Sequence, residues 1–359
     1  MRPHVGIFPK LLFTMVILAV IPLGTSWYIN YRTSLMRISA EVEHLLSTQS
    51  DAVVTYVDTW MEMNIKMLRQ NASLDDIVSM NPERQKPILK SILKEYTWIS
   101  TANGTSPTGQ QIARGDNDTL KYLGDRLWFQ QAIQGSLGAD FVISRSHGVP
   151  TCSLAVPILD EAQKPKGVLQ IGASIASVSD SVIKVKIGNT GYAYLTDENG
   201  TLVAHQKKEF TQVLVNMNKN PAFIGLGQAT KKKTIFTDAT TGVKTVSFAQ
   251  RTKLGWVLIV QQDYDEAYAP VAEANRNALV VLGVTLVLVL LISYVLARRL
   301  TRPILNLAQI ADNISRGELT AKIKETDRID EIGELARAIE RLEAAMKLAI
   351  ERLNMRKAG

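Results

Sequence analysis

Residues that could carry out catalysis are sparse in this chain of 359 residues. It has one cysteine and four histidines, and none of them belongs to a His-Glu-x-x-His motif or a cysteine pair. Gly188-Asn189-Thr190-Gly191 lacks the Lys-Ser/Thr that completes a phosphate-binding loop. The sequence therefore predicts no catalytic residue, no metal site and no cofactor. The single cysteine and the histidines are Cys152, His4, His44, His147 and His205.

A candidate binding surface lies on one predicted strand and the loop before it. Thr151 and Ser153 share a face of that strand, because alternate residues of a strand point the same way. Small polar residues on a covered face indicate either a pocket wall or hydroxyls satisfied inside a core. Arg145 and His147 lie on the adjacent loop, and either could close over an anion. The plainer interpretation of His147 is a solvated loop residue.

Two apolar segments determine which elements position these residues. The first covers about 7–28 and the second 278–297, and each is long enough to cross a bilayer as a helix. A cleaved signal peptide is the rival interpretation of the first segment. The small-residue cleavage pattern around Gly24-Thr25-Ser26-Trp27 is poor, so we expect an uncleaved membrane anchor.

Basic residues beside the two apolar segments predict the orientation. Arg2 and Lys10 precede the first, and Arg298, Arg299 and Arg302 follow the second. Short basic flanks stay in the cytoplasm, so both termini are expected inside and the region between the spans outside. The net charge of +7 is modest. We expect its densest block, 231–233, to be a solvated loop and not a nucleic-acid site.

The outer region begins with a predicted helix over 33–70, which contains neither proline nor glycine. Its apolar face can pack on its own domain, form a dimer seam, or do both. Two α/β lobes are then expected, a distal one over 88–183 and a proximal one over 184–270. Loops are predicted between Thr101 and Thr119, and a helix is predicted to start at Asp125. The predicted strands cover 140–145, 151–159, 167–175, 193–196, 201–204, 233–237, 244–249 and 256–262.

The segment after the second span is patterned as two amphipathic helices. One apolar stripe runs over 304–314, Gly317 ends it, and a second helix is predicted from about Asp330. The second helix has apolar residues at alternating steps of three and four, which is typical of a coiled coil. Two such helices bury their stripes when a dimer forms a four-helix bundle. The second stripe consists of Ile332, Leu335, Ile339, Leu342, Met346, Ala349 and Leu353.

Specific motifs carry a family resemblance. Arg302-Pro303-Ile304, Gly317-Glu318-Leu319 and Asp330-Glu331-Ile332-Gly333 resemble the proline, connector and Asp-Glu-x-Gly elements of HAMP linkers. The region 33–271 is similar to the double Cache domain of bacterial chemoreceptors and sensor kinases. That likeness rests on Asp125-Arg126-Leu127-Trp128-Phe129, Ser153-Leu154-Ala155-Val156-Pro157-Ile158 and Gly188-Asn189-Thr190-Gly191-Tyr192. In this family the lobe far from the membrane usually holds the ligand.

The Cache resemblance implies ligand-binding residues in the distal lobe. Arg126 and Trp128 match the family's pocket pair, which suits a carboxylate because a guanidinium offers a fork of donors and an indole a flat wall. Phe129 stands where amino-acid-binding members carry a tyrosine, and Tyr122 is one residue out of register with their pattern. Gly172 stands where they have an aspartate for the ligand's ammonium. A carboxylate without an amine is therefore expected. The plainer alternative is a structural helix start at Arg126.

These observations together predict an α+β membrane protein. The expected parts are a cytoplasmic N-terminus over 1–10, transmembrane helices over 11–31 and 278–297, a periplasmic sensor over 32–277, a HAMP domain over 298–353 and a tail over 354–359. We predict a homodimeric inner-membrane receptor that binds a small carboxylate or polar metabolite and signals to a separate cytoplasmic partner. The alternatives are a shortened chemoreceptor or histidine kinase and a solute-binding scaffold without signalling. A periplasmic enzyme is a more distant alternative.

Overall fold

The computed structural model describes residues 7–148, 150–207, 210, 215–239, 241–319 and 322–357. It divides into two units, Met36–Pro270 and the pair of segments Met1–Leu35 and Val271–Gly359. We call the first the sensor unit and the second the membrane and linker unit. The basic flank at Arg2 and the last two residues of the predicted tail lie outside the described residues, as does the side chain of Leu353.

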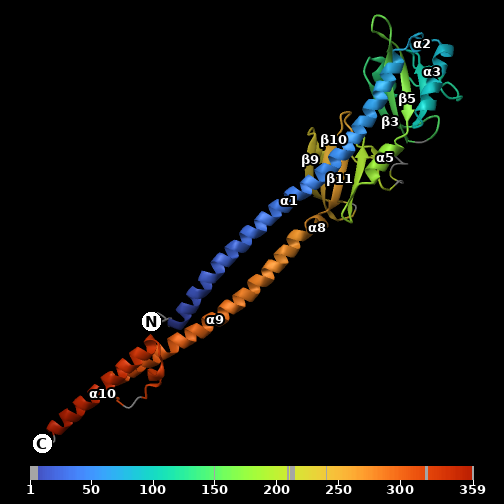
Figure 1. The fold of residues 1–359 in the computed structure, drawn as a ribbon. Coiled ribbons are helices and arrows are strands. Elements are labelled where there is room, and N and C mark those ends of the chain that lie inside the picture. Colours follow the sequence, from blue (N-terminus) through green and yellow to red (C-terminus); the bar gives the residue numbers. More distant parts are fainter. Residues whose placement is uncertain are drawn as a thin grey trace. The chain divides into compact units, whose positions relative to one another are not determined.

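Helix α1 (Ile7–Ala72) is continuous from the first apolar segment into the sensor unit. No proline or glycine interrupts it after Gly24, so nothing in the sequence breaks the hydrogen-bond ladder there. Within the sensor unit this helix runs along both lobes (Figure 1). Its buried stripe packs in a core shared with both lobes, which explains why the apolar pattern extends so far. The stripe includes Val42, Leu46, Val53, Val57, Trp60 and Leu68.

The distal lobe is a five-stranded antiparallel sheet in the order β2-β1-β5-β4-β3. Its strands are β1 (Ile99–Thr105), β2 (Gln111–Arg114), β3 (Gly138–Ile143), β4 (Pro150–Leu159) and β5 (Pro165–Ala173). Its helices are α2 (Asp75–Val78), α3 (Pro82–Glu95) and α4 (Leu127–Ile133). Helix α5 (Ala176–Ile183) follows β5 and packs on the sheet of the proximal lobe.

Two sequence predictions are wrong in the distal lobe. The stretch predicted as loops contains β1 and β2, because pairing of β1 with β5 outweighs the weak strand preference of asparagine and glycine. Helix α4 begins one residue later than expected for a helix capped by Asp125, since the residue before its first turn is Arg126. Asp125 instead forms an ion pair, described below.

The proximal lobe is a second antiparallel sheet in the order β6-β7-β11-β10-β9, with β8 paired to β7. Its strands are β6 (Lys186–Ile187), β7 (Gly191–Thr196), β8 (Leu202–Ala204), β9 (Lys231–Thr237), β10 (Lys244–Arg251) and β11 (Val257–Asp263). Helix α7 (Pro221–Leu226) packs on β9, β10 and β11, and α8 (Tyr264–Ala267) follows β11.

The lysine block at 231–233 is not the predicted solvated loop. It opens strand β9, where Lys231 pairs with Asp51 and Lys233 lies 2.8 Å from Glu43, measured from Nζ to Oε2. Both carboxylates belong to α1. Opposite charges across the helix and the strand edge hold these lysines against the helix, which the sequence pattern alone could not indicate.

In the membrane and linker unit, the start of α1 and most of α9 (Ala269–Ser315) carry the two apolar segments. Both helices are long and apolar enough to cross a membrane. Most large apolar side chains of these segments point outward, as a lipid-facing helix requires. The indole Nε1 of Trp27 donates to Oδ1 of Asn275 over 3.0 Å, which joins the two helices.

The linker that follows packs α10 (Glu331–Lys357) and the short 3₁₀ turn η1 (Lys324–Asp327) against the end of α9, which contains Pro303. Leu319 packs on the cluster that α9 and α10 share, and Glu331 is an exposed first residue of α10. Gly317 ends α9 with a φ of +89°, a conformation that glycine adopts without strain. The cluster consists of Leu307, Ile310, Ile314, Ile323, Ile332 and Ala336.

The Asp-Glu-x-Gly element has a clear physical role in this turn. Oδ1 of Asp330 accepts from the Gly333 N–H at 3.1 Å, and the same carboxylate pairs with Arg328. A Cβ at Gly333 would lie 2.0 Å from the carbonyl oxygen of Arg328, so only glycine fits there. The motif therefore caps α10 and allows the preceding chain to pass close to it.

Candidate ligand-binding site

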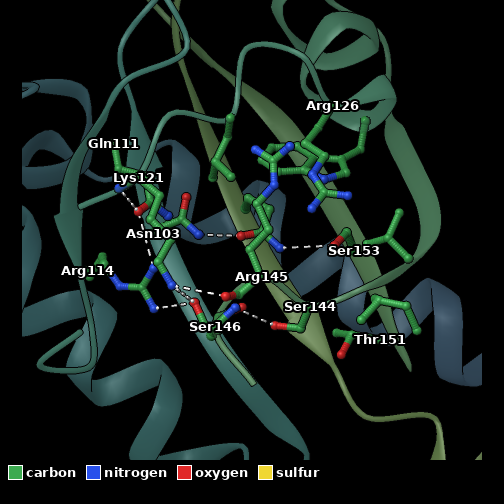
Figure 2. Close-up of a pocket in the computed structure, with 16 residues that line it drawn as sticks. Asn103, Gln111, Arg114, Lys121, Arg126, Ser144, Arg145, Ser146, Thr151 and Ser153 are labelled. Atoms are coloured by element: carbon green, nitrogen blue, oxygen red, sulfur yellow. Dashed lines mark hydrogen bonds between the residues drawn. The ribbon is translucent and has the colours of Figure 1, made fainter. Parts of the chain in front are cut away.

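A small cavity lies on one face of the distal sheet, between that sheet, the start of α4 and the β3–β4 loop. Its volume is about 40 Å³. Figure 2 shows polar side chains from β1, β2, the α4 start and β4 around it. It is lined by Thr101, Asn103, Gln111, Arg114, Lys121, Leu123, Arg126, Trp128, Val142, Ile143, Ser144, Arg145, Ser146, Thr151, Ser153 and Gln170.

The floor of the cavity is a chain of buried amide and hydroxyl groups across three strands. Asn103 on β1 donates to Gln170 on β5, and Gln170 Nε2 donates to Ser153 Oγ on β4 at 3.4 Å. Asn103 and Gln170 face each other in the β1–β5 register, which places the two amides side by side. All three side chains are buried, so these bonds offset the cost of removing them from water.

One wall of the cavity contains two cationic side chains, and each of them is paired with a carboxylate of the same chain. The Arg114 side chain is only 4% exposed, and its Nε lies 2.7 Å from Asp116 Oδ1. Lys121 Nζ lies 2.8 Å from Asp118 Oδ2 and 3.2 Å from Ser146 Oγ. Burial of Asp116 opposes its ionisation, but the hydrogen bond and charge of Arg114 outweigh it and lower its pKa. These two cations are therefore already paired.

Arg126 is the cation at the cavity that has no such pairing. Within the described part of the chain, its guanidinium makes no hydrogen bond and no ion pair, whereas Arg145 beside it pairs with Asp125. Burial, followed by the positive charge of Arg145, lowers the pKa of Arg126. An anion in the cavity would relieve both effects, because it would supply the counter-charge.

Trp128 forms the apolar side of the cavity. It is buried, lies edge-on to Phe129 with ring centroids 6.2 Å apart, and also belongs to the small core under α4. Its indole N–H donates to no acceptor among the described residues, although buried indoles normally find one. The cavity thus combines the guanidinium of Arg126 with the indole ring of Trp128.

The structure brings together five of the eight residues that the sequence singled out for binding. Arg126, Trp128, Arg145, Thr151 and Ser153 all line the cavity.

The other three do not line it. Tyr122 is 56% exposed, and its ring packs beside Gly124 while its carbonyl accepts from Arg145 Nη1 at 3.0 Å. Phe129 is buried in the core under α4. Gly172 lies on β5 between Thr101 and Ser153, and a Cβ there would stand 2.4 Å from Thr101 Oγ1.

Several lining residues were missed in the sequence because they lie on β1 and β2, which were predicted as loops, or follow β2. The available signal was the alternation of polar residues in Thr101-Ala102-Asn103-Gly104-Thr105, which has the two-residue period of a strand. The missed residues include Thr101, Asn103, Gln111, Arg114 and Lys121, together with Gln170 on β5.

Comparison with known families identifies the outer region. The model of the Cache domain family (dCache_1) matches residues 31–271, about two thirds of the chain. The chain belongs to the Cache domain family. The HAMP domain model matches residues 295–342, and both resemblances predicted from the motifs are confirmed. The predicted fold class is confirmed too, as a Cache-type α+β sensor between two candidate membrane helices.

The curated proteins that the chain resembles include methyl-accepting chemotaxis proteins. The chain is 25% identical over 344 residues to the methyl-accepting chemotaxis protein PctB of Pseudomonas aeruginosa, with 90% of this chain and 52% of PctB covered. It is 28% identical over 327 residues to McpC of Bacillus subtilis, covering 91% of this chain and 45% of McpC. The chain thus spans about half the length of these relatives.

Solved Cache domains share the fold of the sensor unit. The ligand-binding domain of Mlp24 with asparagine aligns with a TM-score of 0.54 at 15% identity, covering 67% of this chain and 99% of that one. The ligand-binding domain of Pseudomonas aeruginosa PctB in complex with L-Arg aligns with a TM-score of 0.51 at 18% identity, covering 64% and 98%. At these identities the likeness concerns the Cache fold alone.

Proposed function

We propose that this protein is a transmembrane signalling receptor whose distal lobe binds a small carboxylate outside the cytoplasm. The single observation that carries the ligand class is Arg126, a partly buried guanidinium at the cavity that makes no hydrogen bond and no ion pair among the described residues. A guanidinium binds a carboxylate through two parallel hydrogen bonds, so this chemistry fits an organic acid.

The lining argues against a ligand that carries an ammonium group. None of the described lining residues is aspartate or glutamate. The nearby carboxylates Asp116, Asp118 and Asp125 are already paired with Arg114, Lys121 and Arg145. Asp140 also acts on Arg126 through its charge, but burial raises the pKa of Asp140 and so disfavours its charged form. The solved domains of Mlp24 and PctB contain asparagine and L-Arg, but this cavity would leave an ammonium unpaired. We therefore assign carboxylates or small polar metabolites without an amine.

Ligand entry is proposed to require movement of Arg145. A cavity of about 40 Å³ has room for roughly one water molecule, whose share of liquid volume is about 30 Å³. Arg145 lies on the β3–β4 loop with its side chain partly exposed, and its pairing with Asp125 is at the surface. An incoming carboxylate could exchange for Asp125 on Arg145 while it also binds Arg126.

The signal is proposed to pass through α9 into the HAMP domain. This helix continues without a break from the end of the sensor unit, through its apolar segment and Pro303, to Ser315. A ligand that binds one conformer tenfold better shifts the balance by only about 1.4 kcal/mol per site. The linker must therefore be nearly balanced between two packings before the ligand binds. In this proposal both termini lie in the cytoplasm, and a separate cytoplasmic signalling partner receives the signal.

A homodimer is proposed from the apolar residues that the linker leaves uncovered. Ile332, Ile339 and Met346 pack against α9, but Leu335 and Leu342 are 47% and 54% exposed. Apolar residues at heptad spacing on a free helix face pack on a partner helix in a coiled coil. A second copy would cover them and complete the four-helix bundle. The proposed function includes no enzymatic activity.

Calorimetry on the full chain in nanodiscs tests the proposal, using isosteric series such as propionate, alanine and propylammonium. We expect the organic acid to bind and Arg126→Ala to weaken it at least about tenfold, since a charged hydrogen bond contributes about 1.5–3 kcal/mol. The matched control is Arg84→Ala, because Arg84 pairs with Asp76 outside the cavity and should leave the affinity unchanged. Tighter binding of the amine, or no effect of Arg126→Ala, would contradict the assignment.

A further inference from the structure

The proximal lobe carries a row of polar side chains across the middle of its sheet. Thr234 on β9 faces Ser247 on β10, Ser247 faces Gln261 on β11, and Gln261 faces Tyr192 on β7. We call these four residues the proximal polar row. Tyr194 lies on the same face two residues along β7, since alternate strand residues point the same way. Polar groups in such a position are costly unless they are hydrogen-bonded.

The proximal polar row is only partly satisfied. Gln261 Nε2 donates to the Tyr192 hydroxyl at 2.8 Å, and Ser247 Oγ donates to the Thr234 carbonyl at 3.2 Å. The side-chain oxygens of Gln261, Thr234 and Tyr194 are buried and have no hydrogen-bond partner in the part of the chain that the structure describes. If the Gln261 amide were turned over, its nitrogen would be left unpaired instead. Tyr194 is 1% exposed and Gln261 6%, so bulk water does not satisfy them.

The distal lobe has the same arrangement at the same place in its sheet. Gln170 lies on β5 and Gln261 on β11, and each of these is the central strand of its sheet order. Gln170 accepts from Asn103 and donates to Ser153 on its two neighbouring strands. Gln261 donates to the Tyr192 hydroxyl on one neighbouring strand. The distal arrangement forms the floor of the ligand cavity. Its proximal counterpart differs by keeping buried groups without a partner.

We propose that the proximal lobe holds a second small-molecule site, and that its ligand is an uncharged primary amide. The amide nitrogen would donate to Gln261 Oε1, and the amide oxygen would accept from the Tyr194 hydroxyl. A primary amide is the smallest group that offers two donors and an acceptor in one plane. This site is independent of the carboxylate site proposed above, because it lies on another sheet and uses other residues.

Charge around the proximal site favours a neutral ligand over an organic acid. No lysine or arginine belongs to the proximal polar row. The ring of His205 lies 5.6 Å from that of Tyr192 and 5.9 Å from that of Tyr194, and burial and then the charge of Lys207 lower its pKa, so it is neutral at pH 7. The negative charge of Asp238 acts on both tyrosines and would repel a carboxylate.

Saturation-transfer NMR on the full chain in nanodiscs tests the second site with propionamide, propionate and propylammonium as matched probes. We expect propionamide to bind the wild type and Arg126→Ala equally. Tyr194→Phe and Gln261→Leu should each weaken it at least about tenfold, which corresponds to about 1.4 kcal/mol. Tyr268→Phe is the control, because Tyr268 is a buried tyrosine whose hydroxyl already has a partner, Ser39 Oγ at 3.3 Å.

The melting temperature of each variant shows whether a loss of binding is caused by a loss of folding. Tyr194→Phe removes only an unpartnered buried hydroxyl, so the variant should be at least as stable as the wild type. Loss of propionamide binding in a variant of undiminished stability supports the site. Absence of propionamide binding to the wild type, equal binding by Tyr194→Phe, or preferred binding of propylammonium overturns it. Loss of binding in Arg126→Ala but not in Tyr194→Phe would place the amide in the distal cavity and overturn it as well.

Discussion

Arg145 and Asp125 form a two-point ion pair beside the distal cavity, with Nη1 of the arginine 3.1 Å from Oδ1 of the aspartate and Nη2 bonded to Oδ2. The next residue, Arg126, lines the same cavity, and its guanidinium makes no hydrogen bond or ion pair among the described residues. One arginine is therefore neutralised and its neighbour is not. In the proposed function, this asymmetry separates Arg126, which would bind the ligand, from Arg145, which would control access to it.

Asp125→Asn should strengthen carboxylate binding. The change removes the charge that holds Arg145, so two guanidiniums become available to the ligand, and we expect affinity to rise about three- to tenfold. Stability should change by less than about 1 kcal/mol, because the pair is exposed to solvent. Calorimetry and thermal melting measure the two effects. Weaker binding by Asp125→Asn would mean that Arg145 must be held in place to bind, contrary to the proposed exchange.

Gly172→Asp should destabilise the distal lobe unless Thr101 is shortened. A Cβ at this position meets Thr101 Oγ1 at 2.4 Å and Thr151 Cγ2 at 3.1 Å. Overpacking of this kind costs about 1–3 kcal/mol. In Gly172→Asp with Thr101→Ala, the shorter residue removes the closer clash and leaves a carboxylate on the pocket side of β5. We expect the double variant to recover stability and to bind alanine better than propionate.

Thr101→Ala alone is the control for that experiment, since it adds no carboxylate. It should leave the preference for propionate over alanine unchanged. A double variant that folds but keeps the wild-type preference would show that the missing carboxylate at position 172 does not set the ligand class.

Because of Glu266, the free energy of unfolding should depend on pH in the acidic range. Hydrogen bonds from the Thr190 hydroxyl and from the Asn189 N–H, the latter 2.7 Å from Oε1, lower its pKa to about 2. A carboxylate whose pKa is lower in the folded than in the unfolded state stabilises the fold above about pH 4.3, and loses this effect as the pH falls toward 2. The glycine-rich Gly188–Gly191 turn therefore holds a carboxylate of its own chain.

Glu266→Gln should isolate that contribution, because glutamine does not ionise. The wild type should melt higher than the variant at pH 7, and the difference in melting temperature should shrink as the pH is lowered from 5 to 2. Calorimetric melting of both proteins over this range measures it. A difference that stays constant with pH would exclude Glu266 as the titrating group.

Gly333→Ala should disrupt the HAMP turn more than Gly317→Ala. The added methyl at Gly333 would stand 2.0 Å from the Arg328 carbonyl, so the backbone must move. At Gly317 the space is open and only the left-handed φ of +89° is unfavourable, which costs about 1–2 kcal/mol. We expect Gly333→Ala to abolish ligand-dependent output while leaving calorimetric binding intact. Equal effects of the two substitutions would argue against this steric role.

The sequence alone determined the elements whose signals are local. Membrane-length apolar runs, heptad spacing in α10 and the Gly317 and Asp330–Gly333 motifs each depend on residues a few positions apart, and most central strands were predicted within two residues. The family resemblance also pointed to Arg126 and Trp128, which line the cavity in the structure.

Only the tertiary structure decided which polar residues meet. Asn103 and Gln170 are 67 positions apart and adjacent only because β1 pairs with β5, and the strand nature of Thr101–Thr105 itself depends on that pairing. Gly172 faces Thr101 across the same pair of strands, and this contact is what leaves no room for a larger residue at position 172. The lysines of β9 are paired because α1 passes beside them. Contacts between distant segments are set by the register of strands and helices, and a one-dimensional pattern does not contain that register.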